Sequence, residues 1–310
     1  MTMTPRERAI AALECRIPDE IPTFELEFQL PHELIGRNYI GGELKGTTGA
    51  ERDKLLHEAA EILIQVNTKL EHSIIPIHYG GEDAYKIAKY IHELVGNKFL
   101  LTKHGDGTFS IPDGNNMYDF AYRIDDDPDG LHAEAAANMN RAIEENKRSV
   151  DAGFDSFILC SDYCYNTNPF MSPKMFSEYI TPYLAGIIES IRKDGAYAIK
   201  HTDGNIMPIL DQLIEANPHA IHSIDPQAGV DIKEVKALTK GRVALCGNVN
   251  CGLMQTGTDE EVRQSALYSI EHGKPDGGYI FCTSNCVFRG LPLERYRMIL
   301  DVWKQNRKYG

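Results

Sequence analysis

A histidine and a carboxylate two residues apart are the residues most able to do chemistry in this sequence. His201-Thr202-Asp203-Gly204 follows an apolar run, and Cys286 follows another apolar run much further along the chain. An imidazole, a carboxylate and a thiolate that meet in space are ligands that suit a borderline cation such as zinc. His201, Asp203 and Cys286 are therefore predicted metal ligands.

Each of these residue types also has a structural interpretation. Asp203 could cap a helix beginning near Asn205, because aspartate is a favoured N-cap residue. His222 lies between apolar neighbours and is expected to be a hydrogen-bonded core histidine. Cys286 differs from the other strand-end cysteines because it lies in a loop without core periodicity, which favours a ligand or a nucleophile. Three further cysteines end apolar runs directly and are expected to be small buried hydrophobes, namely Cys160, Cys246 and Cys282.

The elements that must position these residues follow a regular alternation. Short apolar runs are separated by segments with apolar residues at i, i+3, i+4 and i+7, which indicates helices. Such strand-then-helix units predict a (β/α)8 TIM barrel, here as a single domain over residues 1–310. A doubly wound sheet is the competing fold, but Glu27-Phe28-Gln29-Leu30 does not resemble its glycine-rich phosphate loop. The predicted strands are 21–27, 73–78, 98–101, 154–160, 196–201, 220–224, 242–246 and 278–282.

Two segments depart from simple alternation. Residues 102–130 are rich in Gly, Asp and Asn, with a hairpin pattern around Thr108–Ile111, and we expect an insertion over the C-terminal face of the barrel. The helix predicted over residues 173–192 contains Pro182, which should bend it.

Active sites of TIM barrels lie at the C-terminal ends of the strands. Glu25 and Glu27 share one face of the first strand, and a carboxylate inside a barrel is costly unless it is paired or bound to metal. Glu27, at the strand end, is therefore a possible fourth metal ligand. Asp162 and Tyr163 follow the fourth strand, where a carboxylate beside a phenol can orient a polar substrate or simply form a turn. Asn248 is a further candidate catalytic residue after the seventh strand.

Composition limits the partners and the compartment. The net charge of -13 makes nucleic acid and anionic membranes unfavourable partners. No run approaches the roughly 18 apolar residues of a membrane span. The seven cysteines are odd in number and the N-terminus has no secretory signal pattern. A reducing, cytoplasmic location is therefore expected.

The motifs, in this order and spacing, resemble the uroporphyrinogen decarboxylase superfamily across nearly the whole chain. The blocks that carry the resemblance are 161–173, 201–205, 246–249 and 285–286, followed by Pro292-Leu293-Glu294. The resemblance implies a (β/α)8 barrel, in agreement with the strand pattern. Decarboxylases of the superfamily carry an arginine-rich motif on the first strand, whereas residues 24–29 read Phe-Glu-Leu-Glu-Phe-Gln. Decarboxylation of uroporphyrinogen is therefore not expected.

A second branch of that superfamily contains zinc methyltransferases that serve corrinoid proteins. Their signature is His-x-Cys after the fifth strand and a distant cysteine after the eighth. The sequence is similar at His201 and Cys286 but has Asp203 in place of the first cysteine. One thiolate fewer makes the metal a stronger Lewis acid, which suits an oxygen-linked methyl donor better than a thiol.

The resemblance thus implies a methyltransferase component of an O-demethylase system. It would move a methyl group from a methoxylated aromatic, or another small methyl donor, to a separate corrinoid protein. His201, Asp203 and Cys286 would hold zinc, with Glu27 as the fourth ligand, while Asp162 would help to orient the substrate beside the neighbouring phenol.

Two alternatives remain open from the sequence. One is a metal-free decarboxylase or lyase of a small metabolite, with Asp162 or Glu27 as acid or base. The other is a non-catalytic barrel that binds a corrinoid or another small molecule.

Overall fold

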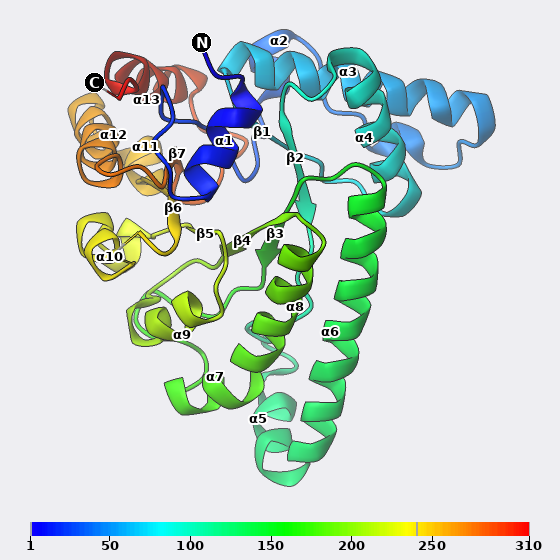
Figure 1. The fold of residues 1–310 in the computed structure, drawn as a ribbon, viewed down its shortest axis with the longest axis vertical. Helices are drawn as coiled ribbons and strands as arrows, with labels where there is room; N and C mark the ends of the chain where they lie inside the picture. The colour runs from blue at the N-terminus through cyan, green and yellow to red at the C-terminus, as the bar shows by residue number, and fades with distance from the viewer. Residues whose placement is uncertain (1, 240, 310) are drawn as a thin grey trace.

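Seven parallel strands form a single sheet in the computed structural model, which describes residues 2–239 and 241–309 (Figure 1). The sheet order is β1-β2-β3-β4-β5-β6-β7, so each strand pairs with the next one along the chain. This order is that of a TIM-barrel-like α/β fold. The strands are β1 (Ile74–Pro76), β2 (Leu100–His104), β3 (Ser156–Cys160), β4 (Tyr197–His201), β5 (Ala220–His222), β6 (Ala244–Val249) and β7 (Tyr279–Thr283).

Helices connect the strands and cover the outside of the sheet (Figure 1). The α-helices are α1 (Pro5–Leu13), α2 (Pro31–Ile35), α3 (Gly49–Leu70), α4 (Gly81–Val95), α5 (Met117–Asp126), α6 (Pro128–Asp151), α7 (Pro173–Tyr179), α8 (Thr181–Lys193), α9 (Leu210–Glu215), α10 (Ile232–Thr239), α11 (Cys251–Thr256), α12 (Asp259–Gly273) and α13 (Leu293–Asn306). The described part of the chain also contains the short 3-10 helices η1 (Gly42–Leu44), η2 (Met207–Ile209) and η3 (Pro226–Ala228). No helix among the described residues is both long enough and apolar enough to cross a membrane.

The predicted first strand, 21–27, is irregular, so an eighth regular strand is not confirmed. The segment lies between β7 and β1, because Thr23 forms a parallel bridge with Phe281 and its carbonyl accepts the Ser73 N–H at 2.6 Å. A regular ladder would next join the Thr283 N–H to the Phe24 carbonyl. That N–H instead points to the Glu25 carboxylate, at 3.2 Å. A side chain thus replaces the main chain in the ladder and ends the regular pairing.

Residues 102–130 also differ from the sequence prediction. Residues 102–104 belong to β2, and residues 105–116 contain no strand, so the predicted hairpin was wrong. The loop crosses the C-terminal end of β3, where Ile111 N–H donates to Asp162 O at 2.8 Å. Helix α5 then projects beside α6 without a buried side chain. The Gly, Asp and Asn content reflects this exposed loop and helix, whereas a paired hairpin needs alternating apolar residues.

The long helix predicted over residues 173–192 is divided into α7 and α8. The break falls at Ile180, two residues before Pro182, as expected for a residue that lacks an N–H and clashes with the preceding turn. Ser172 caps α7 by accepting the Met175 N–H at 3.3 Å.

Two apolar clusters build the core. The larger lies between the sheet and its helices, and the smaller fills the inside of the curved sheet with alternate strand residues such as Ile158, Ile199 and Ile280. Helix α1 contributes Ala9 and Leu13 to this inner cluster, close to the N-terminal ends of the strands. The apolar interior leaves the C-terminal ends as the place where polar side chains gather.

A buried histidine makes the stability of this core dependent on pH. His72 bonds Asn67 Oδ1 at 2.9 Å and Tyr296 Oη at 2.8 Å, and burial lowers its pKa from 6.5 to about 3. A lowered pKa means that the unfolded chain takes up a proton first as the pH falls. Stability is therefore lost below pH 6.5, by about 2 kcal/mol between pH 7 and pH 5 from this residue.

The variant His72→Gln is expected to remove that dependence. Urea unfolding at the two pH values measures it, and the loss of unfolding free energy should be about 2 kcal/mol smaller in the variant. His57→Gln, on the exposed face of α3, is the control and should leave the dependence unchanged. An equal loss in wild type and His72→Gln would show that His72 is not the responsible group.

Candidate metal-binding site and adjoining cavity

Strand register brings the candidate residues together. In the β3–β4 pair Cys160 lies opposite His201, and in the β4–β5 pair His201 lies opposite His222. Side chains alternate along a strand, so Asp162 and Asp203 continue the inward faces of β3 and β4 beyond the strand ends. The strand register therefore places an imidazole and two carboxylates at one edge of the sheet.

Asp162, His201 and Asp203 form a group able to hold a metal ion. One ligand atom from each lies within 4.8 Å of the other two. His201 Nε2 is 3.6 Å from Asp162 Oδ1 and 3.9 Å from Asp203 Oδ1, which is too long for hydrogen bonds. Among the described residues no other group of three His, Cys, Asp or Glu side chains meets this criterion.

The buried histidine pair explains how His201 can present a lone pair. His201 Nδ1 and His222 Nδ1 are 2.7 Å apart, so one of these atoms carries the proton. If the Nδ1 of His201 donates this hydrogen bond, its Nε2 is unprotonated and its lone pair faces two carboxylates. A bound cation would accept that lone pair and balance the charge of the carboxylates. Burial lowers the pKa of His201 to about 3, which keeps the ring neutral. His222, buried as predicted, then acts as the outer partner that orients a ligating histidine.

Asp203 is held by side chains and does not cap a helix. Its Oδ1 accepts the Ser223 hydroxyl at 3.0 Å and its Oδ2 accepts the Asn285 amide at 2.5 Å. No helix begins at Asn205, because residues 203–206 form a loop before η2. Burial, and then the nearby Asp162 carboxylate, raise the pKa of Asp203 to about 7. A metal cation bound between Asp162 and Asp203 would stabilise the charged carboxylates and so oppose both increases in the pKa of Asp203.

Gly204 allows the two carboxylates to lie close together. Its φ is +81°, and a Cβ there would lie 2.5 Å from Cys164 O in the loop after β3. Only glycine permits both the left-handed conformation and this close approach. The loop after β4 therefore packs directly on the loop that carries Asp162.

Two predicted metal ligands lie outside this three-residue group. Cys286 is in the same rim, since its neighbour Asn285 bonds Asp203, but its thiol is not among the ligand atoms within 4.8 Å. Burial, and then neighbouring Cys251, raise the pKa of the Cys286 thiol to about 12. Glu27 also lies apart from the group. Burial lowers the pKa of His78, and the Glu27 charge opposes this decrease; it also adds to the effect of burial that raises the pKa of Cys286, which places Glu27 on their side of the rim.

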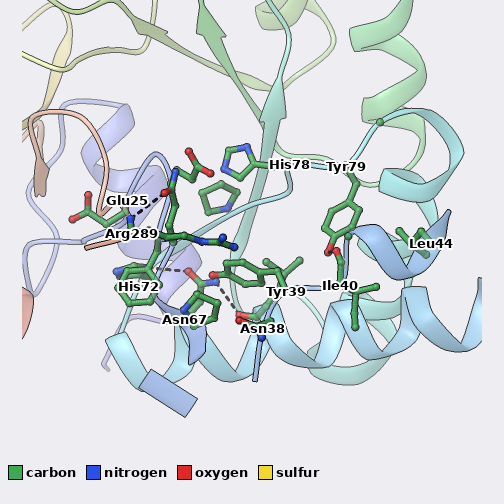
Figure 2. Close-up of a pocket in the computed structure, with 18 residues that line it drawn as sticks. Glu25, Asn38, Tyr39, Ile40, Leu44, Asn67, His72, His78, Tyr79 and Arg289 are labelled. Atoms are coloured by element: carbon green, nitrogen blue, oxygen red, sulfur yellow. Dashed lines mark hydrogen bonds between the residues drawn. The ribbon is translucent and has the colours of Figure 1, made fainter. Parts of the chain in front are cut away.

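Glu27 borders a cavity of about 640 Å³ (Figure 2). Its volume falls within the roughly 300–1,000 Å³ typical of small-molecule sites. Figure 2 shows Tyr39, Tyr79 and His78 around it, with Arg289 reaching in from the loop after β7. Asp162, His201 and Asp203 do not line this cavity. The ligand group and the cavity are thus neighbouring parts of one rim, linked by residues 285–289.

Glu25 and His78 have fixed partners at the same rim. Burial raises the pKa of Glu25 to about 8, although the hydroxyl and N–H of Thr283 bond its carboxylate and oppose the increase. His78 Nε2 donates to Leu26 O at 2.9 Å, because a carbonyl can only accept. His78 Nδ1 then accepts from His104 Nε2 at 3.1 Å, and His104 Nδ1 is an acceptor without a partner among the described residues.

The predicted catalytic residues Tyr163 and Asn248 are bonded to other residues of the fold. Tyr163 is fully buried, its ring packs on Phe176, and its hydroxyl bonds Thr108. Asn248 donates to Ile224 O at 2.8 Å and accepts from Ser269 on α12 at 3.2 Å. Both side chains therefore use their polar atoms within the fold, and we do not include them in the proposed site.

A buried ion pair supports the rim from outside the sheet. Lys200, adjacent to His201, is 0% exposed and donates to Asp106 at 2.8 Å. It also donates to the carbonyls of Leu159 and Ser161, each at 3.0 Å. These bonds hold the end of β3 immediately before Asp162.

Sequence reasoning missed several partners in this site. Asp162 was expected to contact substrate rather than to join the ligand group. Ser223 and Asn285 had no predicted role, because a single serine or asparagine after a strand is ordinary loop composition. Lys200 was part of a correctly predicted strand, but the burial of its ammonium group becomes visible only in the structure.

Comparison with known families identifies the chain. The model of the uroporphyrinogen decarboxylase (URO-D) family matches residues 114–305, which is more than half of the sequence. The chain belongs to this family. No curated protein matches the sequence significantly.

Solved structures of related fold include a methyltransferase from Methanosarcina mazei. It is 16% identical, with a TM-score of 0.75, over 98% of this chain and 99% of that chain. At this identity the likeness shows that the two chains share a fold. N-acetylneuraminate lyase from Fusobacterium nucleatum is more distant, at 13% identity and a TM-score of 0.42, over 81% of this chain and 70% of that chain.

Proposed function

We propose that the protein is a zinc-dependent methyltransferase that moves a methyl group from a methoxylated aromatic to a corrinoid protein. The observation that carries the proposal is the position of His201 Nε2, which faces the carboxylates of Asp162 and Asp203 without a hydrogen bond to either. This arrangement lies at the strand ends of a URO-D family fold and beside a cavity of about 640 Å³. The methyltransferase with a similar fold supports the reaction class.

The residues of this chain have separate tasks in such a reaction. His201 and Asp203 would hold zinc, with Asp162 beside them and Cys286 as the thiolate of the same rim. When bound, zinc would supply Lewis acidity that lowers the basicity of the leaving oxygen. His222 orients His201, and Ser223 and Asn285 orient the Asp203 carboxylate.

The chemistry balances without a further reactant. The bond between the donor oxygen and its methyl carbon breaks, and both bonding electrons stay on the oxygen. The methyl carbon forms its new bond with the electron pair of a reduced cobalt(I) corrinoid. The oxygen leaves as a phenolate and takes a proton from solvent. Substrate and cobalt centre must meet at the rim, because metal ligands and cavity both lie there.

Metal analysis combined with a methyl-transfer assay tests the proposal. Purified protein is incubated anaerobically with free cob(I)alamin and a panel of methoxylated aromatics, and methylcobalamin and the released phenol are quantified. Equal amounts of both products are expected, together with about one zinc per chain, loss of turnover with a chelator and recovery with zinc. Metal-free decarboxylation or lyase turnover would favour the lyase alternative, and bound metal without turnover of any donor would favour a binding protein.

The variant Cys286→Ala tests the thiolate assignment. Loss of a residue that only orients a metal ligand typically weakens metal binding roughly 10–100-fold. Loss of Cys286 as a direct ligand should weaken zinc binding at least as much. A competition titration with a chromophoric chelator measures this affinity. Cys15→Ala, a half-buried thiol away from the rim, is the control. Unchanged affinity in Cys286→Ala would exclude the thiolate and leave Asp162 as the third ligand.

A further inference from the structure

Lys200 makes contacts that converge on the end of β3. Its ammonium group is 0% exposed and carries three N–H donors. The three acceptors are the Asp106 carboxylate at 2.8 Å and the carbonyls of Leu159 and Ser161, each at 3.0 Å. The same ammonium lies 3.9 Å from the centre of the Tyr163 ring, where a cation–π interaction adds to these bonds. Every donor of a buried ammonium group is therefore used at one place in the fold.

The loop after β2 completes this arrangement. Asp106 lies in that loop, and its Oδ1 accepts the backbone N–H of Thr108 at 2.8 Å and the Thr108 hydroxyl at 2.7 Å. Its Oδ2 accepts the Lys200 ammonium. The Ser161 hydroxyl donates in turn to Thr108 O at 3.1 Å. Lys200 thus joins three segments, namely its own strand β4, the end of β3 and the loop after β2.

The carboxylate of Asp162 depends on its backbone for its position. The side chain is 52% exposed, and it accepts the Asp203 N–H through a long bond of 3.3 Å. The backbone is held more firmly, because Asp162 O accepts the Ile111 N–H at 2.8 Å. Lys200 supplies an anchor on the other side, at the carbonyl of the peptide bond that joins Ser161 to Asp162. Loss of that anchor should therefore loosen the Asp162 carboxylate.

Stability alone does not account for a charge at this place. A buried ion pair is rarely more stabilising than apolar residues of similar volume, because both charges lose their hydration. Lys103 on β2 is a second buried lysine, 7% exposed, and it donates to Glu145 at 2.9 Å and to Ser149 at 3.1 Å, both on α6. Lys103 thus fastens a helix to the sheet, whereas Lys200 fastens the strand end that carries Asp162.

We propose that Lys200 is a positioning residue of the metal centre, which sets the metal affinity by holding Asp162 opposite His201. The inference rests on the proposed function, because that function requires the centre. Adjacent side chains of a strand face opposite sides, so Lys200 acts from outside the sheet while His201 faces inward. The bond to Ser161 O then fixes the separation of the two ligands, whose nearest atoms are 3.6 Å apart.

The double variant Lys200→Met with Asp106→Asn tests this role, since it removes the three donors without leaving a buried charge. Its zinc affinity, measured by competition with a chromophoric chelator, should fall roughly 10–100-fold, as for other partners that orient a ligand. The absorption spectrum of the cobalt(II)-loaded protein should change as well, because it reports the ligand geometry. Urea unfolding checks that the variant is folded. The matched control, Lys103→Met with Glu145→Gln, should keep the affinity and the spectrum of wild type.

The variant Thr108→Val gives a milder test that leaves the ion pair in place. It removes one hydroxyl bond to Asp106, so zinc affinity should fall roughly 2–10-fold, the worth of one hydrogen bond. This variant decides the question if the double variant does not fold, and unchanged affinity in it would then overturn the role of Lys200.

The outcomes separate the positioning role from the metal centre itself. A folded double variant with wild-type affinity and spectrum would overturn the role of Lys200. An equal loss of affinity in the control with Lys103 and Glu145 replaced would overturn it too, because any buried pair would then have the same effect. Wild-type protein that binds neither zinc nor cobalt(II) would reject the proposed metal centre, and the positioning role with it.

Discussion

The variant His201→Ala is expected to lose bound zinc and nearly all methyl transfer. His201 is the one nitrogen ligand of the three-residue group, and its removal leaves Asp162 and Asp203 as two carboxylates without the atom that lies between them. Loss of Lewis-acid assistance is worth several kcal/mol, which corresponds to a decrease on the order of 10³-fold in kcat/KM. Elemental analysis and the cob(I)alamin assay measure the two effects.

Two further variants make the His201 result specific. His57→Ala, on the exposed surface of α3, should keep the zinc content and the activity of wild type. His222→Phe keeps a ring but removes the Nδ1 partner of His201, and we expect roughly 10–100-fold weaker zinc binding. Full zinc occupancy and normal turnover in His201→Ala would refute the proposed metal centre.

The variant Lys200→Met is expected to give the largest loss of stability. Burial raises the pKa of the Asp106 carboxyl, but the charge and hydrogen bond of Lys200 outweigh it and hold that pKa below its usual range. Without Lys200 the Asp106 side chain, only 6% exposed, is a buried charge with no counter-charge. Breaking such a pair typically costs about 3–5 kcal/mol, which urea unfolding at pH 7 would measure.

A second substitution tests whether the buried charge causes that loss. The double variant Lys200→Met with Asp106→Asn removes both charges and should recover much of the unfolding free energy. Lys86→Met is the control, because Lys86 and Asp53 form a solvent-exposed ion pair, and such pairs contribute little to stability. A loss in Lys200→Met no larger than in Lys86→Met would show that the pair does not stabilise the fold.

Local patterns were sufficient to predict most strands and the chemistry of their ends. The mainly apolar runs at 156–160, 197–201 and 279–283 form strands, as expected, because a central parallel strand is covered on both faces. Pro182 divides its helix because proline lacks a backbone N–H and its ring clashes with the preceding turn. His201 and Asp203 face the same side because they are two residues apart at the end of one strand, where side chains alternate with a period of two.

Contacts between distant segments decided what local patterns could not. The irregular first strand depends on Glu25 meeting Thr283, residues separated by most of the chain. The absence of a hairpin in 105–116 depends on that loop packing on the end of β3. Tyr163 looked like a substrate contact beside Asp162, but Thr108 and Phe176 enclose it.

The sequence by itself determined the family, the barrel-like alternation of strands and helices, and a histidine and carboxylate at the end of one strand. Tertiary structure alone decided that Asp162 joins them, that Cys286 and Glu27 lie outside that group, and that Arg289 enters a neighbouring cavity. The physical reason is that residue type and period specify which way a side chain faces. Distances between loops depend on packing, as at Gly204, where only a missing Cβ lets two loops meet.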